Sequence, residues 1–322
     1  MSTVVAVAGG SGNLGRTIVE AILADGKFTP IILARKASCA LTLPSVENPA
    51  KAKLIGAPIL AVDYTNVESL TKSLEEANVA VVISVLNTMA SIEPELNLIA
   101  ASDASKPTKR FIPSIWGVKF PPETIELFPS AKGKLDVIDA LASTSLEYTV
   151  WIPGYFSDWY IAPHLKTYMS TFAIVVDVAN NTAAIPGSAN VPVALTYTFD
   201  MAKLVAASLT LPKWELETYC IGDKVTWNEL IAIAEEVKGT KFKVTYDSVE
   251  KLRTLSVTEL PDHPQTYSFF PKEMLQAFLA TFGIMFDNGT FNLTPAHDIQ
   301  QDFPDIKVHS VKELLTEAWK GK

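Results

Sequence analysis

The sequence predicts an α/β fold built on a doubly wound parallel sheet, and three observations support this prediction. Short, continuous apolar segments alternate with amphipathic segments through the first half of the chain. Glycines cluster directly after the first apolar segment. The 322 residues are 48% hydrophobic and 19% charged, which is typical of a globular protein with one large domain or two coupled ones. Buried strands joined by crossover helices form parallel sheets that are covered on both faces.

The order of the segments gives the expected elements. The predicted strands cover residues 3–9, 29–35, 58–64, 79–85, 109–114 and 146–153, and the predicted helices cover 13–26, 67–77, 94–105 and 132–144. After residue 154 the pattern changes to aromatic residues and short extended segments. A helix at 200–212, a strand at 217–222, a helix at 226–239 and a closing helix from 311 are expected beyond that point.

This pattern predicts two interwoven domains. The first, a dinucleotide-binding domain, is expected to comprise residues 1–154 and about 198–237. A smaller C-terminal substrate-binding domain is expected from about 155–197 and 238–322. No repeat or low-complexity linker separates them.

Composition and charge exclude several classes of protein. The net charge of -8, with no cluster of Lys and Arg, argues against nucleic-acid binding. No apolar run reaches the ~18 residues of a membrane span, and the N-terminus lacks the features of a secretory signal. Cys39 and Cys220 lie far apart and outside any metal-ligand spacing, so we expect free thiols, no bound metal and a cytoplasmic location.

The segment VVAVAGGSGNLGR, residues 4–16, is the first candidate site. Glycines at positions 9, 12 and 15 are also compatible with a tight turn alone, because glycine tolerates a positive φ. A buried strand before them and an amphipathic helix after them favour a Rossmann-like pyrophosphate site at the helix N-terminus. The expected contacts are Gly9, Ser11, Gly12, Asn13, Leu14 and Gly15.

The end of the second strand bears on the choice of dinucleotide. An NAD site usually has an acidic residue there, about 20 residues beyond the glycines, whereas a ribose 2′-phosphate needs cations. This sequence has Arg35 and Lys36, with no acid in the ten residues that follow. The pair favours NADP(H), and the alternative is two solvated cations at a strand end.

In these features the chain resembles the isoflavone-reductase-like and NmrA-like group of atypical short-chain dehydrogenases. The matching segments are VAGGSGNLGR, ILARKAS, ISVLN, KRFIPSIWG and AKGKLDVIDAL, and the resemblance covers most of residues 1–160. It implies an NADP(H)-dependent reductase of secondary metabolism. It also implies further cofactor contacts at Ser84, Val85, Leu86, Pro113, Ser114, Lys132, Pro153, Tyr155 and Phe156.

In that group, a lysine early in the helix after the fifth strand acts with the nicotinamide and the substrate, and Lys132 occupies the matching position. Such a lysine stabilises an oxyanion or exchanges a proton if burial lowers its pKa. Lys134 is the rival, since it lies about 200° further round the helix and only one of the two can face a cleft. A third possibility is that both lysines lie at the surface.

Two departures from related patterns concern the chemistry and the substrate. No tyrosine precedes a lysine by four residues, which disfavours the ordinary Ser-Tyr-Lys carbonyl reductase. The family pattern also has an acidic residue where this chain has Ile115 or Trp116. Trp116 adds an apolar face there, so we expect a small hydrophobic substrate that is aromatic or conjugated.

The segment WIPGYFSDWYIAPH leaves the sixth strand at the edge where ligands bind in open α/β sheets. Its aromatic residues are expected to wall the substrate, with Asp158 and His164 as polar neighbours. The alternative is a packing layer between domains. The expected substrate pocket comprises Trp116, Tyr155, Phe156, Trp159 and Tyr160.

The residues leave three functions open. The first is reduction of the substrate by hydride transfer from nicotinamide C4. The second is an NADP(H)-sensing regulator without turnover, which needs neither Lys132 nor an apolar pocket. The third is a biosynthetic enzyme that isomerises or cyclises its substrate without net redox change. A monomer or a homodimer is expected.

Overall fold

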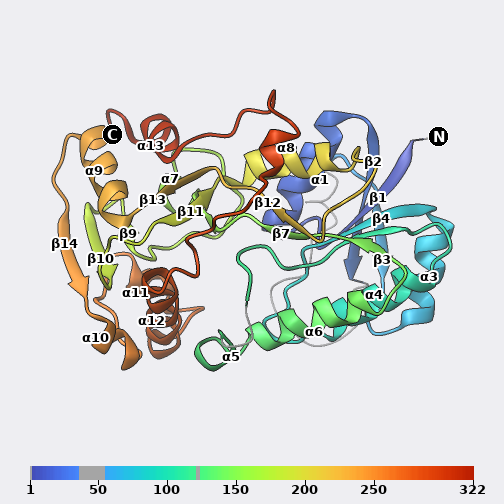
Figure 1. Ribbon diagram of the computed structural model, residues 1–322, viewed down its shortest axis with the longest axis horizontal. Coiled ribbons are helices and arrows are strands. Elements are labelled where there is room, and N and C mark those ends of the chain that lie inside the picture. Colours follow the sequence, from blue (N-terminus) through green and yellow to red (C-terminus); the bar gives the residue numbers. More distant parts are fainter. Residues whose placement is uncertain (1, 36–54, 121–123) are drawn as a thin grey trace. The chain divides into compact units, whose positions relative to one another are not determined.

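The computed structural model describes residues 2–35, 55–120 and 124–322, which form two compact units (Figure 1). The first unit comprises Met1–Trp116, Phe120–Ile152 and Ala202–Thr218, and the second comprises Gly117–Lys119, Pro153–Met201 and Tyr219–Lys322. The chain therefore passes between the units several times.

The core of the first unit is a six-stranded, wholly parallel sheet in the order β3-β2-β1-β4-β5-β6. This order reverses direction between β1 and β4, which is the usual ligand position in an open α/β sheet. The prediction of a doubly wound parallel sheet is confirmed. The strands are β1 (Thr3–Ala8), β2 (Phe28–Arg35), β3 (Ile59–Val62), β4 (Val79–Ser84), β5 (Arg110–Ile112) and β6 (Glu147–Tyr148).

Helices cover both faces of this sheet. On one side, α3 and α6 each pack against α4, and α1 lies on the other side (Figure 1). Helix α1 buries Ile18 and Ile22 completely and ends at Gly26, whose positive φ gives the left-handed turn that closes the helix. The helices are α1 (Asn13–Asp25), α3 (Val67–Glu76), α4 (Glu93–Ala104), α5 (Thr124–Leu127) and α6 (Ala131–Ala142).

The sixth predicted strand, at 146–153, is divided in the structure. Its first part, β6, pairs with β5, and its second part, β7 (Val150–Ile152), pairs with β12 (Glu217–Tyr219) in a separate two-stranded sheet. The hydroxyls of Thr149 and Thr218 lie 2.7 Å apart at this change of partner. The single strand predicted at 146–153 thus contributes residues to two sheets.

The second unit contains two three-stranded sheets, in the orders β14-β10-β9 and β13-β11-β8. Helix α8 (Thr198–Ser208) begins in this unit and continues into the first. The remaining elements are β8 (Tyr155–Phe156), α7 (Asp158–Ile161), β9 (Val176–Asp177), β10 (Thr182–Pro186), β11 (Val193–Thr196), β13 (Asp223–Val225), α9 (Trp227–Lys238), β14 (Lys243–Asp247), α10 (Val249–Arg253), α11 (His263–Thr266), α12 (Lys272–Asp287), η1 (Ile299–Gln301) and α13 (Val311–Trp319).

The boundary of the first unit differs from the prediction. Its last segment is Ala202–Thr218, whereas the sequence pattern placed about residues 198–237 in the first domain. Helix α9 belongs to the second unit because its apolar side packs against α13. An amphipathic pattern predicts a helix, but it does not identify the surface that the helix covers.

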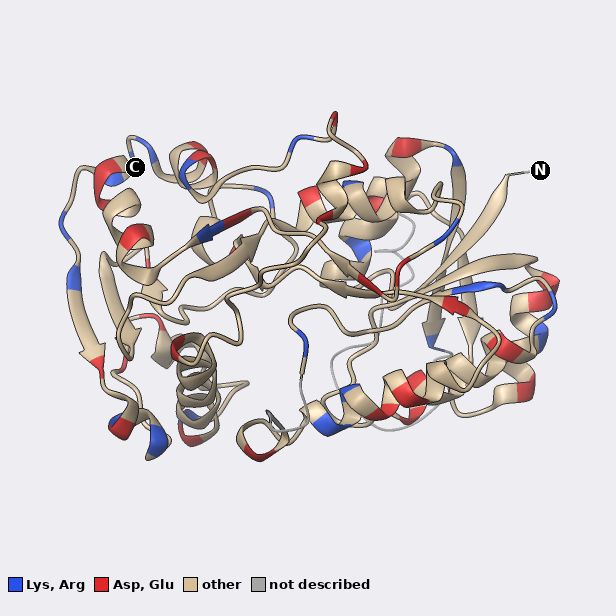
Figure 2. Cartoon of the chain, in the orientation of Figure 1, with Lys and Arg blue, Asp and Glu red and all other residues tan. Residues whose placement is uncertain are grey.

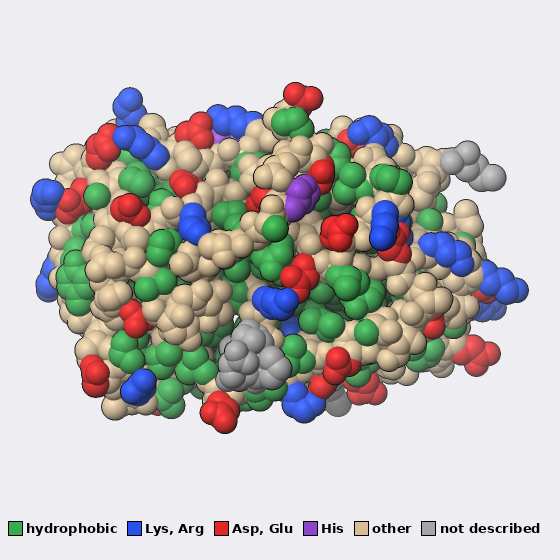
Figure 3. All heavy atoms as spheres, in the orientation of Figure 1, with side chains coloured by type: hydrophobic (Ala, Val, Ile, Leu, Met, Phe, Trp, Pro, Cys, Tyr) green, Lys and Arg blue, Asp and Glu red, His purple; other side chains and the backbone are tan. Residues whose placement is uncertain are grey.

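Charges of both signs are mixed over the chain. Along α6 the basic residues come first and the acidic ones follow (Figure 2). On the face drawn in Figure 3, charged side chains are interspersed with apolar ones. None of the helices in the described part of the chain is both long and apolar enough to span a bilayer.

Candidate active site

The glycine turn after β1 is closely packed against β4 and α1. Gly9 has a φ of +76°, and a Cβ placed there would lie 3.0 Å from the carbonyl oxygen of Val85. A Cβ on Gly15 would lie 2.2 Å from the carbonyl oxygen of Gly9, well inside van der Waals contact. Glycine is therefore required at position 15 for α1 to approach the strand end.

The N-terminus of α1 has no side-chain cap. Its N-cap is Gly12, which is exposed, has extended backbone and offers no side chain to the first-turn amides. By contrast, α9 and α13 cap themselves with Thr226 and Ser310. Next to Gly12, the hydroxyl oxygen of Ser11 is buried and has no hydrogen-bond partner among the described residues.

These features fit a phosphate group. A helix N-terminus carries partial positive charge, and α1 has no acidic residue in its first turn to compete with an anion. Asn13 and Leu14 are the first two residues of that turn. The buried Ser11 hydroxyl adds a donor that is otherwise unsatisfied, and such groups are rare in native structures.

At the second predicted cofactor position, Arg35 ends β2 opposite Val62 of β3 and is exposed. Lys36, the other cation of the predicted 2′-phosphate site, lies outside the described residues, as does Cys39. Arg35 alone represents this part of the site in the structure.

The ends of β4 and β5 lie beside the glycine turn and are joined by hydrogen bonds. The Val85 amide donates to the carbonyl of Ala8 at 3.0 Å, and the Ser114 hydroxyl donates to the carbonyl of Leu86 at 2.8 Å. The indole N–H of Trp116 donates to the Ser84 carbonyl at 2.9 Å. The structure thus brings together the residues that the ISVLN and KRFIPSIWG segments predicted, with Pro113 buried among them.

Sequence reasoning missed one acidic residue at this edge. Glu95, near the start of α4, is fully buried, and its carboxylate accepts hydrogen bonds from the Ser84 hydroxyl and, at 2.9 Å, from the Ser114 amide. Burial raises the pKa of Glu95, and these hydrogen bonds and the charge of Lys134 oppose that rise. An acidic residue in the first turn of a helix is common because it interacts favourably with the helix dipole, so nothing in the sequence marked Glu95 as a site residue.

The two candidate lysines of α6 have different surroundings. The side chain of Lys132 is 66% exposed, and its Nζ lies 2.7 and 2.8 Å from the two carboxylate oxygens of Asp136. Lys134 points inward: its Nζ donates to the hydroxyl of Thr88 at 2.8 Å and to the carbonyl of Ser114. Burial lowers the pKa of Lys134, and the attraction of Glu95 opposes this.

This arrangement changes which lysine we propose for the chemistry. The resemblance assigned the role to Lys132, but its ammonium is in solvent and is paired with a carboxylate on the next turn. Lys134 is partly buried and held by two hydrogen bonds, and burial lowers its pKa, the direction that favours proton transfer. Lys134 therefore replaces Lys132 as the candidate catalytic lysine.

The predicted aromatic residues divide between the units. Trp116 is in the first unit, where its ring lies 6.1 Å from that of Trp151. Tyr155 is in the second, buried with its hydroxyl unpaired among the described residues. Its ring lies 5.4 Å from Phe286 and 5.9 Å from Phe291. These contacts give Tyr155 a packing role within the second unit.

The remaining members of the segment have mixed environments. Tyr160 is buried against Trp227, whereas Phe156 and Trp159 are partly exposed. Asp158 is buried and accepts hydrogen bonds from Thr167 at 2.7 Å and from the Thr198 hydroxyl and amide at 2.7 and 3.0 Å, so it has a structural role.

Two further residues near this segment also have structural partners. The His164 ring is 4.6 Å from that of Trp319. Pro153 is buried, and its carbonyl accepts a hydrogen bond from Thr196 at 2.7 Å. Neither contact points to a reaction.

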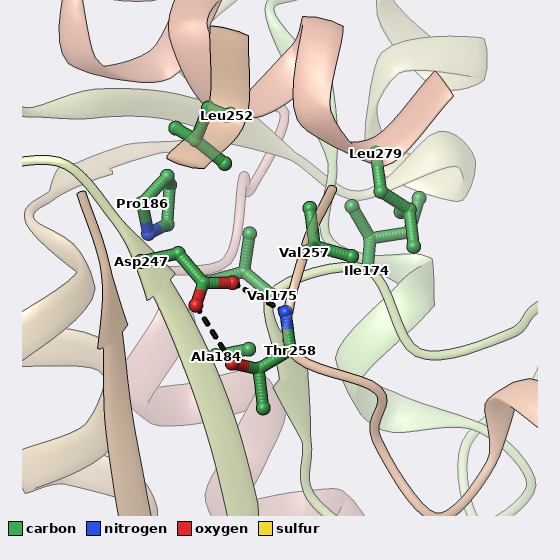
Figure 4. Close-up of a pocket in the computed structure, with 10 residues that line it drawn as sticks. Ile174, Val175, Ala184, Pro186, Asp247, Leu252, Val257, Thr258 and Leu279 are labelled. Carbon is green, nitrogen blue, oxygen red and sulfur yellow. Dashed lines mark hydrogen bonds between the residues drawn. The ribbon is translucent and has the colours of Figure 1, made fainter. Parts of the chain in front are cut away.

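A small cavity in the second unit is not a substrate site. It lies between β10, β14 and the helices α10 and α12, and Figure 4 shows Asp247 bonded within it to the amide and hydroxyl of Thr258. Its volume of about 10 Å³ is that of a single water molecule. No group of three His, Cys, Asp or Glu side chains that could hold a metal occurs among the residues the structure describes.

Comparison with known proteins supports the resemblance seen in the sequence. The model of the NmrA-like family matches residues 1–313. Oxidoreductase BOA1 of Botryotinia fuckeliana (strain B05.10) is 31% identical over 307 residues, which cover 94% of this chain and 95% of that protein. Isoflavone reductase homolog P3 of Arabidopsis thaliana is 24% identical over 326 residues, which cover 96% of this chain and 96% of that protein.

The fold agrees with this relationship. The structure of AtPrR2 with NADP+ and (+)-pinoresinol has a TM-score of 0.74 and 24% identity, and the match covers 98% of each chain. The likeness confirms the Rossmann-like fold. Since the family match extends over nearly the whole length and a relative above 30% identity covers almost all of the chain, the protein belongs to the NmrA-like family.

Proposed function

We propose that this protein is an NADPH-dependent reductase of the isoflavone-reductase-like type that acts on a small hydrophobic, aromatic or conjugated substrate. One observation carries the proposal: a partly buried lysine, Lys134, is fixed by hydrogen bonds at the same sheet edge as an uncapped glycine turn. A dinucleotide site alone needs no such lysine. The relatives named oxidoreductase and isoflavone reductase homolog, and the NADP+ complex of the structural neighbour, support the same class.

Different groups of the protein bind different parts of the dinucleotide. The first-turn amides of α1 and the Ser11 hydroxyl hold the pyrophosphate, and Arg35 binds the ribose 2′-phosphate. NADPH supplies the hydride when bound. The other predicted cofactor contacts, at the ends of β4 and β5, remain part of this proposal.

Lys134 acts on the substrate oxygen. Its ammonium hydrogen-bonds to that oxygen and stabilises the negative charge, or transfers a proton to it, while Ser114 holds the side chain in place. Water-exposed Lys132 is not required for this step. Trp116, tied by its indole N–H to the Ser84 carbonyl, supplies a fixed apolar surface for an aromatic ring.

The test has two stages. First, binding of NADPH and NADH is measured by nicotinamide fluorescence and thermal shift, and we expect tighter binding of NADPH. Second, NADPH deuterated at C4 is incubated with a panel of aromatic enones, benzylic ethers and quinones. Deuterium on a product carbon supports reduction of an enone or a benzylic ether, and formation of a hydroquinone with oxidation of NADPH supports reduction of a quinone.

The alternatives give different results in the same experiment. Tight NADPH binding with no turnover of any panel member supports the sensor. Conversion of a substrate without NADPH oxidation supports isomerisation or cyclisation. Preference for NADH contradicts the role of Arg35.

A further inference from the structure

Glu95 is the most unusual charged group in the first unit. It is 0% exposed, yet it lies on the first turn of a helix. Its two carboxylate oxygens accept from different strands: one from the Ser84 hydroxyl at the end of β4, the other from the Ser114 amide after β5. A buried carboxyl is costly unless it is fully hydrogen-bonded. Its partners here place it at the carboxyl edge of the sheet.

Ser114 is held at several points. Besides its amide bond to Glu95, its hydroxyl donates to the Leu86 carbonyl at 2.8 Å. The Ile115 amide donates to the Pro113 carbonyl at 2.7 Å, which makes Ser114 the centre of a three-residue turn. The remaining polar atom of Ser114, its carbonyl oxygen, accepts from Lys134. Glu95 and Lys134 are thus linked through one residue.

The two groups also interact by charge. Among the described residues, Lys134 is the one titratable group whose charge affects the pKa of Glu95, and Glu95 is the one that affects the pKa of Lys134. For each residue, burial is the largest cause of the pKa shift, and the attraction between the two charges acts in the opposite direction. The other charged groups on the helices packed against α4 are at the surface or paired there: Glu68, Lys72, Glu75, Glu76, Lys132, Asp136 and Asp139.

We propose that Glu95 is a positioning residue, which fixes Ser114 so that its carbonyl anchors Lys134 and whose negative charge keeps that lysine in its ammonium form. This inference rests on the proposed role of Lys134 in the reaction. It assigns Glu95 no contact with substrate or cofactor. Its effect on catalysis runs through the position and protonation of Lys134.

The direct test measures the titration of Lys134 without turnover. The full chain is acetylated with acetic anhydride over a pH series, and the rate at each lysine is read by peptide mass spectrometry. In Glu95→Gln, which keeps the size of the side chain but removes its charge, the titration midpoint of Lys134 is expected to move to lower pH. At pH values below the midpoint, the acetylation rate of Lys134 divided by that of Lys132 is expected to be about threefold higher in Glu95→Gln than in the wild type.

Two other variants make the result specific. Glu93→Gln changes an exposed glutamate of the same helical turn and is expected to leave the midpoint unchanged. Glu95→Asp keeps the charge but withdraws it by one methylene, so it is expected to shift the midpoint in the same direction by less. It also provides a second variant if Glu95→Gln does not fold, as judged by thermal unfolding.

An unchanged Lys134 midpoint in folded Glu95→Gln or Glu95→Asp overturns the inference, as does an equal shift in Glu93→Gln. The reaction provides a second readout. In Glu95→Gln the limb of the kcat/KM profile that depends on Lys134 is expected to move to lower pH with the midpoint. If the wild-type protein proves to have no turnover, the proposed reductase function fails, but the acetylation experiment still decides the link between Glu95 and Lys134.

Discussion

The side-chain nitrogen of Lys134 donates a hydrogen bond to the main-chain carbonyl of Ser114. This bond ties the first turns of α6 to the turn that follows β5, and it directs a lysine toward the sheet edge where the glycine turn lies. Two residues earlier, Lys132 extends into solvent instead. The account of function depends on this difference between two lysines of one helix.

Gly15→Ala is expected to disrupt the cofactor site through backbone packing. The added Cβ would lie 2.2 Å from the Gly9 carbonyl oxygen and 2.8 Å from the Gly10 Cα, so α1 must move away from the strand end. Overpacking of this kind costs about 1–3 kcal/mol, and we expect lower thermal stability together with weaker NADPH binding.

Thermal unfolding with and without NADPH measures both effects. Gly117→Ala serves as the control for stability, because a Cβ there has nothing within 4 Å. Equal stability of the two alanine variants would contradict the packing argument.

Arg35→Ala is expected to weaken NADPH binding by about tenfold to a hundredfold, the value of a hydrogen bond between charged groups. NADH lacks the 2′-phosphate, so its binding should change little. Titration of nicotinamide fluorescence with each cofactor gives the comparison, and Arg253→Ala, an exposed arginine of α10, is the control. A loss shared equally by both cofactors would show that Arg35 does not recognise the phosphate.

His263 makes stability depend on pH. Its Nδ1 accepts from the Leu260 amide at 3.2 Å, which needs the neutral ring and leaves Nε2 to donate to the Ala173 carbonyl at 3.0 Å. Protonation of the ring breaks the bond from Leu260, whereas the bond to Ala173 persists. Burial lowers the pKa of His263 in the folded protein. The stabilisation is therefore present above the ordinary pKa of about 6.5 and is lost as pH falls through the lowered one.

The expected result is a melting temperature that falls between about pH 7 and about pH 5 in the wild type, and falls less in His263→Gln. The variant is less stable at neutral pH because a buried hydrogen bond is lost. His297→Gln, which changes an exposed ring, should keep the pH dependence of the wild type. If the melting temperature depends on pH equally in the wild type and both variants, His263 is not the source of that dependence.

Local patterns in the sequence predicted the first half of the fold well. The strands and helices up to α6 follow from apolar runs, amphipathic spacing and turn glycines, all of which act within a few residues. The unit to which α9 belongs was not predictable in the same way. Its pattern shows an apolar face, but the partner of that face, α13, begins more than 70 residues beyond the end of α9.

The candidate site shows the same limit. The glycine turn was predictable because each glycine has a local steric reason. The choice between Lys132 and Lys134 was not predictable, since their exposure depends on how α6 is oriented on its neighbours. That orientation places Gly133, between the two lysines, against the side chain of Ile92. Glu95 was missed because only tertiary contacts make it buried.

The paired substitution of the two lysines tests the central claim most directly. Once a substrate is found by the deuterium experiment, kcat is measured for Lys134→Met and Lys132→Met, with NADPH affinity as the check on folding. Lys134→Met is expected to lose about 10²–10⁴-fold in kcat while Lys132→Met stays close to the wild type. Full activity of Lys134→Met, or the larger loss in Lys132→Met, would contradict the account.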